Sequence, residues 1–153
     1  MKLCLLLEPT IDKKWHLAKQ SGVQYGVTKL TPALTKRIPP YDFNSLKYFK
    51  TKFDEFGIKL IGLEGDQFDM SRIKYGSSGR DEDIENFQKM IQNMGKLGLN
   101  LLCYNFMAGQ GWLRTSNNSP ARGGAYCTRF DYERMNNHLD PSLIGISEEL
   151  LWE

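Results

Sequence analysis

The chain repeats one short pattern, in which a helical stretch is followed by a glycine and then by a short apolar strand. Gly22, Gly57 and Gly98 occupy the middle position of three such units. Glycine is the usual residue after the last helical turn, because it adopts a left-handed backbone without steric cost. Helices that alternate with short apolar strands are typical of α/β folds. We therefore predict an α/β fold.

Two of the predicted helices carry an apolar stripe at helical spacing. The stripes are Leu46, Phe49, Phe53 and Phe56, and Ile84, Phe87, Ile91 and Met94. Spacings of three and four residues place each set on one helix face, which predicts core and not a binding surface. Asp42 or Asn44 is expected to cap the first helix and Asp81 the second. A shorter helix is predicted between Ile11 and Ser21.

The strands are predicted near residues 2–7, 23–30, 58–63 and 99–106. Right-handed crossovers make such a sheet parallel. Units of this length are typical of a (β/α)₈ barrel, which needs about 250 residues for eight units. We expect residues 1–153 to form one partial barrel domain, the N-terminal half with four βα units, truncated at the start of a helix near 147–153. A doubly wound open sheet is the competing arrangement.

Composition and charge limit the kinds of molecule that the protein can be expected to bind. The formal net charge is +2 and the basic residues are scattered, so we expect neither nucleic acid nor a membrane surface as partner. No apolar stretch approaches the roughly 20 residues that cross a bilayer. The apolar start ends at Glu8-Pro9 without a cleavage site, so it is interpreted as a strand and not as a signal peptide. Three cysteines without a C-x-x-C pair favour a reduced, cytoplasmic protein.

The most informative stretch for function is the run from Leu99 to Ser116, which changes from apolar to polar residues. Ligands of strand–helix folds bind just beyond the carboxyl ends of the strands. Tyr104, Asn105, Trp112 and Arg114 are therefore expected where a small polar molecule would be bound. Cys103 lies inside the predicted strand and is expected to be packed. The segment from Ala108 to about Gly145 is predicted to be a long functional loop.

The ends of the other predicted strands add candidate ligand-binding residues. Lys29 ends the second predicted strand, and Lys74 lies in the loop after the third. Glu64 ends the third strand, where a carboxylate is costly unless it meets a cation, a metal or a hydroxyl group. His16 and His138 have no metal-ligand spacing, and the chain contains no triad, phosphate loop or paired carboxylates. We therefore assign no catalytic residue and no metal ligand within this chain.

Several segments resemble mannonate dehydratase, a family of the xylose-isomerase-like TIM barrels. Residues 103–107 read CYNFM and residues 111–115 read GWLRT. Further similar segments are residues 73–76, 79–86, 94–95, 122–125, 130–132 and 146–149. Together they extend from Gly57 to the end of the chain, and the opening third agrees in layout.

The resemblance implies a hydro-lyase of hexuronate (glucuronate) catabolism, which converts D-mannonate to 2-keto-3-deoxy-D-gluconate and water. It implies Mn²⁺ or Fe²⁺ as cofactor, with the metal ligands and proton-transfer groups expected beyond residue 153. The substrate-binding residues it carries over are Asn105 and Arg114, followed by Lys29, Glu64 and Lys74. We expect this chain to be inactive alone and the full-length protein to be a homo-oligomer that acts on a small-molecule sugar acid.

Two alternatives stay open. A sugar isomerase or epimerase would share the same barrel and the same polar strand ends. A natural half-barrel would act without catalysis, as a binding module. The residues that follow in a longer chain would separate them, because a downstream set of His, Cys and Asp ligands supports dehydration.

Overall fold

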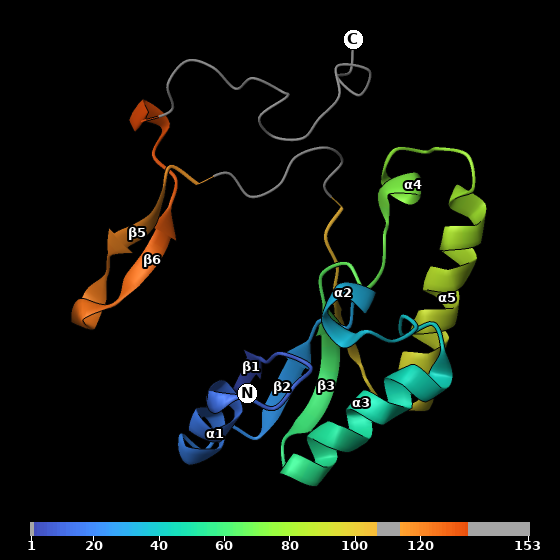
Figure 1. The fold of residues 1–153 in the computed structure, drawn as a ribbon, viewed down its shortest axis with the longest axis horizontal. Helices are drawn as coiled ribbons and strands as arrows, with labels where there is room; N and C mark the ends of the chain where they lie inside the picture. Colours follow the sequence, from blue (N-terminus) through green and yellow to red (C-terminus); the bar gives the residue numbers. More distant parts are fainter. Residues whose placement is uncertain (1, 107–113, 135–153) are drawn as a thin grey trace. The chain divides into compact units, whose positions relative to one another are not determined.

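A computed structural model describes residues 2–106 and 114–134 of the chain. The chain divides into two compact units, residues 1–106 and residues 107–153. The first unit holds a four-stranded sheet in the order β1 (Cys4–Leu6), β2 (Tyr25–Thr28), β3 (Lys59–Glu64) and β4 (Leu101–Cys103). All three strand pairs are parallel (Figure 1). The predicted parallel α/β fold is confirmed.

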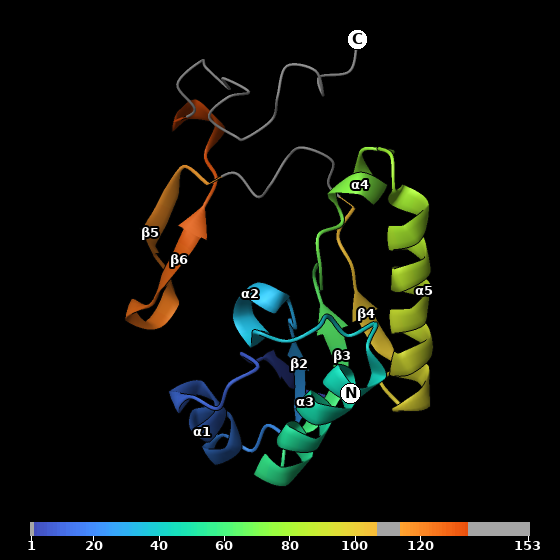
Figure 2. The ribbon, with the colours of Figure 1, turned by 45° about the vertical axis from the view of Figure 1, so that its right-hand side comes forward.

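Helices connect the strands in the predicted order. The long connections are α1 (Lys13–Gln20), α3 (Phe43–Phe56) and α5 (Arg80–Lys96). Two single-turn helices, α2 (Pro32–Thr35) and α4 (Ser71–Lys74), follow the carboxyl ends of β2 and β3. Figures 1 and 2 show α3 and α5 side by side along the sheet. Within the described residues, every helix is too short or too polar to span a bilayer.

The core lies between the sheet and the three long helices. Trp15 of α1 and Phe53 of α3 are fully buried, with ring centroids 4.1 Å apart. Leu60 and Leu63 of β3 and Met90 of α5 belong to the same buried cluster. Burial of apolar surface is the main favourable term in folding, at about 25 cal/mol per Å². One continuous core therefore joins all three long helices to the sheet.

The two apolar stripes have different outcomes. The stripe on α3 is core, because Leu46, Phe49 and Phe53 are buried and Phe56 packs against them. On α5, Met94 is buried and Phe87 is partly buried, but Ile84 and Ile91 are 37% and 47% exposed. The prediction that this whole stripe is core is therefore wrong. The reason is that β4 is an edge strand of the described sheet, so nothing described covers the side of α5 beyond it.

The ends of the helices follow local chemistry. Gly22, Gly57 and Gly98 have φ angles of 75°, 87° and 71°, which confirms their role after helix ends. Asp42 caps α3, because its Oδ1 accepts from Ser45 N at 2.7 Å. The prediction that Asp81 caps α5 is wrong, since α5 begins after Gly79. Asp81 lies in the first turn instead, where a carboxylate favours the positive end of the helix dipole.

The cap of α3 can be tested directly. Replacing Asp42 by alanine removes the acceptor for Ser45 N and is expected to lower the free energy of unfolding by about 0.5–2 kcal/mol. Replacing Asn44, the other residue that the sequence allowed as a cap, is expected to change it by less than about 0.5 kcal/mol. Urea unfolding followed by circular dichroism measures both. Equal losses in the two variants would contradict this assignment of the cap.

The second unit contains a small antiparallel hairpin. Its strands are β5 (Ser116–Pro120) and β6 (Tyr126–Arg129), with a 3₁₀ turn at Arg122–Gly124 and another at Tyr132–Arg134. The sequence predicted only a loop here, because the strands are polar and lack alternating apolar residues. The one available signal was the pair Gly123-Gly124, which has φ angles of 70° and 76° in the turn. Trp112, His138 and the helix expected near 147–153 lie outside the described residues.

Candidate functional site

Three of the five predicted substrate-binding residues lie at the carboxyl ends of neighbouring strands. Lys29 directly follows β2, Glu64 ends β3, and Asn105 lies just beyond β4. These strands are adjacent in the sheet, so the three residues share one edge. All three are partly buried. Their side chains have no hydrogen-bond or ion-pair partner among residues 2–106 and 114–134.

Lys29 and Glu64 carry opposite charges at the ends of neighbouring strands, and the structure shows no ion pair between them. The Lys29 Nζ lies near Gly65, the residue that follows Glu64. A Cβ built on Gly65 would be 3.7 Å from that nitrogen. An ammonium attracts a carboxylate, a carboxylate accepts from hydroxyl groups, and the Asn105 amide both donates and accepts. Together these groups suit a small molecule that carries one carboxylate and several hydroxyls.

Lys74 has a partner of its own. Its Nζ forms an ion pair with Asp66 Oδ2, and its side chain is 12% exposed. This pair joins the loop after β3 to α4. A substrate would have to compete with Asp66 for the ammonium, so contact between Lys74 and substrate stays a prediction.

Arg114 belongs to the second unit, beside the hairpin. Its Nε donates to Thr128 Oγ1 at 3.0 Å. The neighbouring Thr115 donates from its backbone N to Arg129 O at 2.9 Å, so the start of the hairpin is anchored at this point. The predicted substrate contact of Arg114 likewise stays a prediction.

A second cluster of charges, which sequence reasoning missed, fixes α4 to α5 near the same edge of the sheet. The Arg72 guanidinium forms two hydrogen bonds with Asp83, one of them from Nε to Oδ2 at 2.6 Å, and Glu82 lies 3.4 Å away. Hydrogen bonding to Asp83 raises the pKa of Arg72 above its usual range. Hydrogen bonds from Ser71 lower the pKa of Asp69 below its usual value. Asp69 is therefore ionised at neutral pH and stabilises the start of α4.

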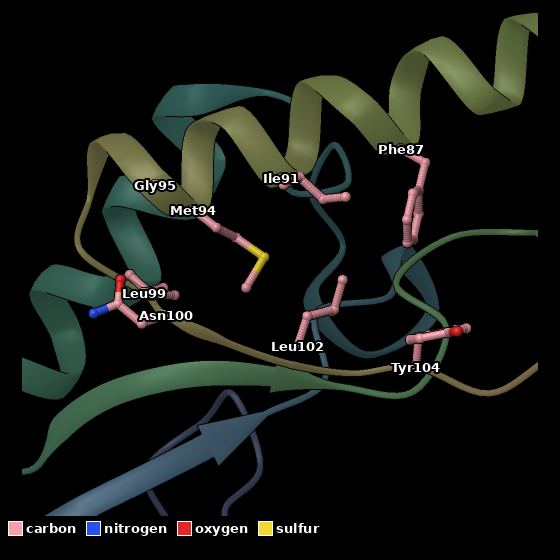
Figure 3. Close-up of a pocket in the computed structure, with 8 residues that line it drawn as sticks. All are labelled: Phe87, Ile91, Met94, Gly95, Leu99, Asn100, Leu102 and Tyr104. Atoms are coloured by element: carbon pink, nitrogen blue, oxygen red, sulfur yellow. The ribbon is translucent and has the colours of Figure 1, made fainter.

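Beyond these polar residues, an apolar groove of about 450 Å³ lies between α5 and β4 (Figure 3). Its lining is Phe87, Ile91, Met94, Gly95, Leu99, Asn100, Leu102 and Tyr104. With one amide and no charged group, it does not suit a sugar acid.

Cys103, expected to be packed, is exposed, so that prediction is wrong. The open groove and the exposure of Cys103 have the same cause, because β4 has no outer neighbour among the described strands.

The described residues hold no cluster of metal ligands. Among residues 2–106 and 114–134, no three His, Cys, Asp or Glu side chains come together in a way that could hold a metal ion. The described residues therefore do not fit a divalent metal by themselves.

Comparison with known proteins gives consistent matches. The chain is 32% identical over 96 residues to a mannonate dehydratase of Brachyspira hyodysenteriae, which covers 63% of this chain and 26% of the relative. It is 27% identical over 114 residues to a mannonate dehydratase of Enterococcus faecalis, covering 73% and 32% of the two chains. The matched part thus spans about a quarter to a third of these relatives.

A solved structure and a family model agree with these matches. The crystal structure of mannonate dehydratase from Streptococcus suis serotype 2 superposes with a TM-score of 0.75 at 24% identity, covering 99% of this chain and 46% of that one. At this identity the superposition supports the fold. The family model of D-mannonate dehydratase (UxuA) matches residues 14–152, nearly the whole chain. The chain therefore belongs to the D-mannonate dehydratase family.

Proposed function

We propose that this chain supplies the substrate-binding wall of a mannonate dehydratase. The reaction removes water from D-mannonate to give 2-keto-3-deoxy-D-gluconate, within cytoplasmic hexuronate catabolism. One observation carries the proposal: a cation, a carboxylate and an amide stand at three adjacent strand ends, with no partner among the described residues. Membership of the family selects this reaction over sugar isomerisation or epimerisation.

Each of the three side chains has a role that follows from its chemistry. The Lys29 ammonium pairs with the substrate carboxylate and offsets negative charge that develops beside it when the neighbouring proton is removed. The Asn105 amide bonds substrate hydroxyls, and the Glu64 carboxylate accepts from one of them. Arg114 and Lys74 are proposed as further substrate contacts. The guanidinium of Arg114 suits a carboxylate because it can donate two parallel hydrogen bonds to it. None of these five residues is assigned a proton-transfer role.

The proposal includes a divalent metal, Mn²⁺ or Fe²⁺, in the complete enzyme. Such an ion would stabilise the enediolate that forms when the proton next to the carboxylate is lost. Its ligands are proposed to lie outside the described residues, because these do not form a donor set. We accordingly expect this chain to show no turnover by itself, and the active protein to be a homo-oligomer.

We also propose that the four βα units are half of a (β/α)₈ barrel, with residues 1–153 as one partial barrel domain. Residues of α1, α3 and α5 share one buried cluster, so the long helices lie on one face of the sheet. A doubly wound sheet carries helices on both faces, so this arrangement favours the barrel. The apolar groove beside β4 supports it further, because a fifth unit of the barrel would pack there.

A binding experiment tests the proposed function. D-mannonate added to the labelled chain is expected to shift the NMR signals of Lys29, Glu64 and Asn105. Replacing Lys29 by alanine is expected to weaken binding by about ten- to a hundredfold, because a charge-assisted hydrogen bond contributes about 1.5–3 kcal/mol. Lys47→Ala, on the exposed side of α3, is the matched control and is expected to leave the affinity unchanged. D-mannose, which lacks the carboxylate, should shift the same signals less. Equal shifts with both sugars, or none with D-mannonate, would overturn the proposal.

A further inference from the structure

Gln67 is a buried side chain that joins two strand ends. It is 1% exposed. Its Oε1 accepts from Leu30 N at 2.8 Å, just beyond β2. Its Nε2 donates to the carbonyl oxygens of Glu64 and Gly65, both at 2.8 Å, at the end of β3. A buried amide is costly unless its polar atoms are bonded, and here both ends of the amide are used.

The groups that Gln67 bonds belong to the candidate site or adjoin it. Leu30 directly follows Lys29, and the Glu64 carbonyl is part of the other candidate residue. The Lys29 ammonium also lies over Gly65, whose carbonyl is the third group that Gln67 bonds. One amide therefore links the backbone next to Lys29 to the backbone of Glu64, and its hydrogen bonds go to main-chain atoms, not to either charged group.

The neighbouring strand ends are joined by similar bonds. Thr28, which is fully buried, donates from Oγ1 to Leu7 O at 2.7 Å and so links β2 to the end of β1. Gly65 N donates to Cys103 O at 2.7 Å and links β3 to β4. Gln67 thus forms the middle part of a line of hydrogen bonds that crosses all four strand ends. A site formed by residues from several strands needs such fixed spacing, since small displacements reduce binding and rate.

We propose that Gln67 is a positioning residue, which holds Lys29 and Glu64 at the separation that receives the carboxylate and a hydroxyl of one sugar-acid substrate. This inference rests on the proposed function and deepens it. Gln67 itself does not bind substrate. It acts through the backbone at Leu30, Glu64 and Gly65, and its loss is expected to change the site while the protein stays folded.

The test replaces Gln67 by methionine, which has similar length and none of the three hydrogen bonds. Met90→Ala is the control, because Met90 is a buried residue of α5 whose loss weakens the core. Both variants are studied at a temperature where circular dichroism shows them folded. Gln67→Met is expected to move the NMR signals of the Lys29 side chain and the Glu64 carboxyl carbon, and to raise the dissociation constant of D-mannonate about tenfold, or 1.4 kcal/mol. Met90→Ala is expected to leave both unchanged.

The outcomes separate this inference from the proposed function. If the unmodified chain binds D-mannonate and Gln67→Met binds it equally well, the inference is overturned and the proposed function stands. If the unmodified chain does not bind D-mannonate, the proposed function fails together with the sugar-acid part of the inference, and the side-chain signals then decide whether Gln67 positions Lys29 and Glu64. Unmoved Lys29 and Glu64 signals in folded Gln67→Met, or equal movement in Met90→Ala, would show that Gln67 only stabilises the fold.

Discussion

Replacing Trp15 by alanine is expected to lower the free energy of unfolding by about 3–5 kcal/mol, the usual cost of deleting a large buried aromatic side chain. The indole is fully buried and contacts the rings of Phe53 and Phe56, at centroid distances of 4.1 and 5.2 Å. Its Nε1 donates to Glu8 O at 3.0 Å, in the segment that follows β1. The variant therefore loses packing of α1 on α3 and the anchor of the first loop together.

Two further variants divide this loss into its parts. Trp15→Phe keeps a ring but removes the hydrogen bond to Glu8, and is expected to cost less than the alanine variant. Lys14→Ala, on the exposed side of the same helix, is expected to stay within about 0.5 kcal/mol of the unmodified chain. Urea unfolding followed by fluorescence and circular dichroism measures all three. A loss under about 1 kcal/mol for Trp15→Ala would contradict its place in the core.

Replacing Gly62 by alanine is expected to destabilise the protein by about 1–3 kcal/mol and to separate β3 from β4 locally. Gly62 is paired with Leu101 across the two strands. A Cβ built at Gly62 would lie 2.6 Å from Leu101 Cβ and closer still to the Leu101 carbonyl oxygen. Because part of this obstacle is backbone, it cannot be relieved by a side-chain rotation, and β4 has to move.

Hydrogen exchange of the β4 amides measures this effect, and faster exchange is expected at Leu102 and Cys103. Gly95→Ala is the matched control, because a Cβ at Gly95 would meet nothing within 4 Å. Within α5 this control is expected to stabilise the protein by about 0.5–1 kcal/mol, since alanine is the better helix former. Similar effects of the two substitutions would contradict the close approach of β3 and β4.

Much of the fold could be predicted because its signals are local. The glycines after the helices, the apolar stripe of α3 and the choice of Asp42 or Asn44 as cap all depend on a few neighbouring residues. The hairpin was missed for the same reason, since its strands carry polar residues and no period. The exposure of Ile84 and Ile91 was missed because burial depends on which elements pack against a helix. The spacing of apolar residues along the helix carries no information on those elements.

The candidate site was predictable only in part. The rule that ligands bind beyond the carboxyl ends of parallel strands was enough to select Lys29, Glu64 and Asn105. It could not select Gln67, because the hydrogen bond that Gln67 Oε1 accepts from Leu30 N joins residues far apart in the sequence. It also could not foresee that Lys74 has Asp66 as a partner, or that Arg72 is bound to Asp83. A side chain has no sequence signature for a partner that only folding brings near.

The order of residues by itself determined the alternation of strands and helices, the parallel sheet and the strand ends at which polar side chains gather. These follow from backbone preferences and from apolar periods, which act over one or two turns. Tertiary structure alone decided which of those polar groups are paired, as Lys74 is with Asp66. It also placed the Gln67 amide between β2 and β3, because a hydrogen bond between distant residues exists only once the strands are packed side by side.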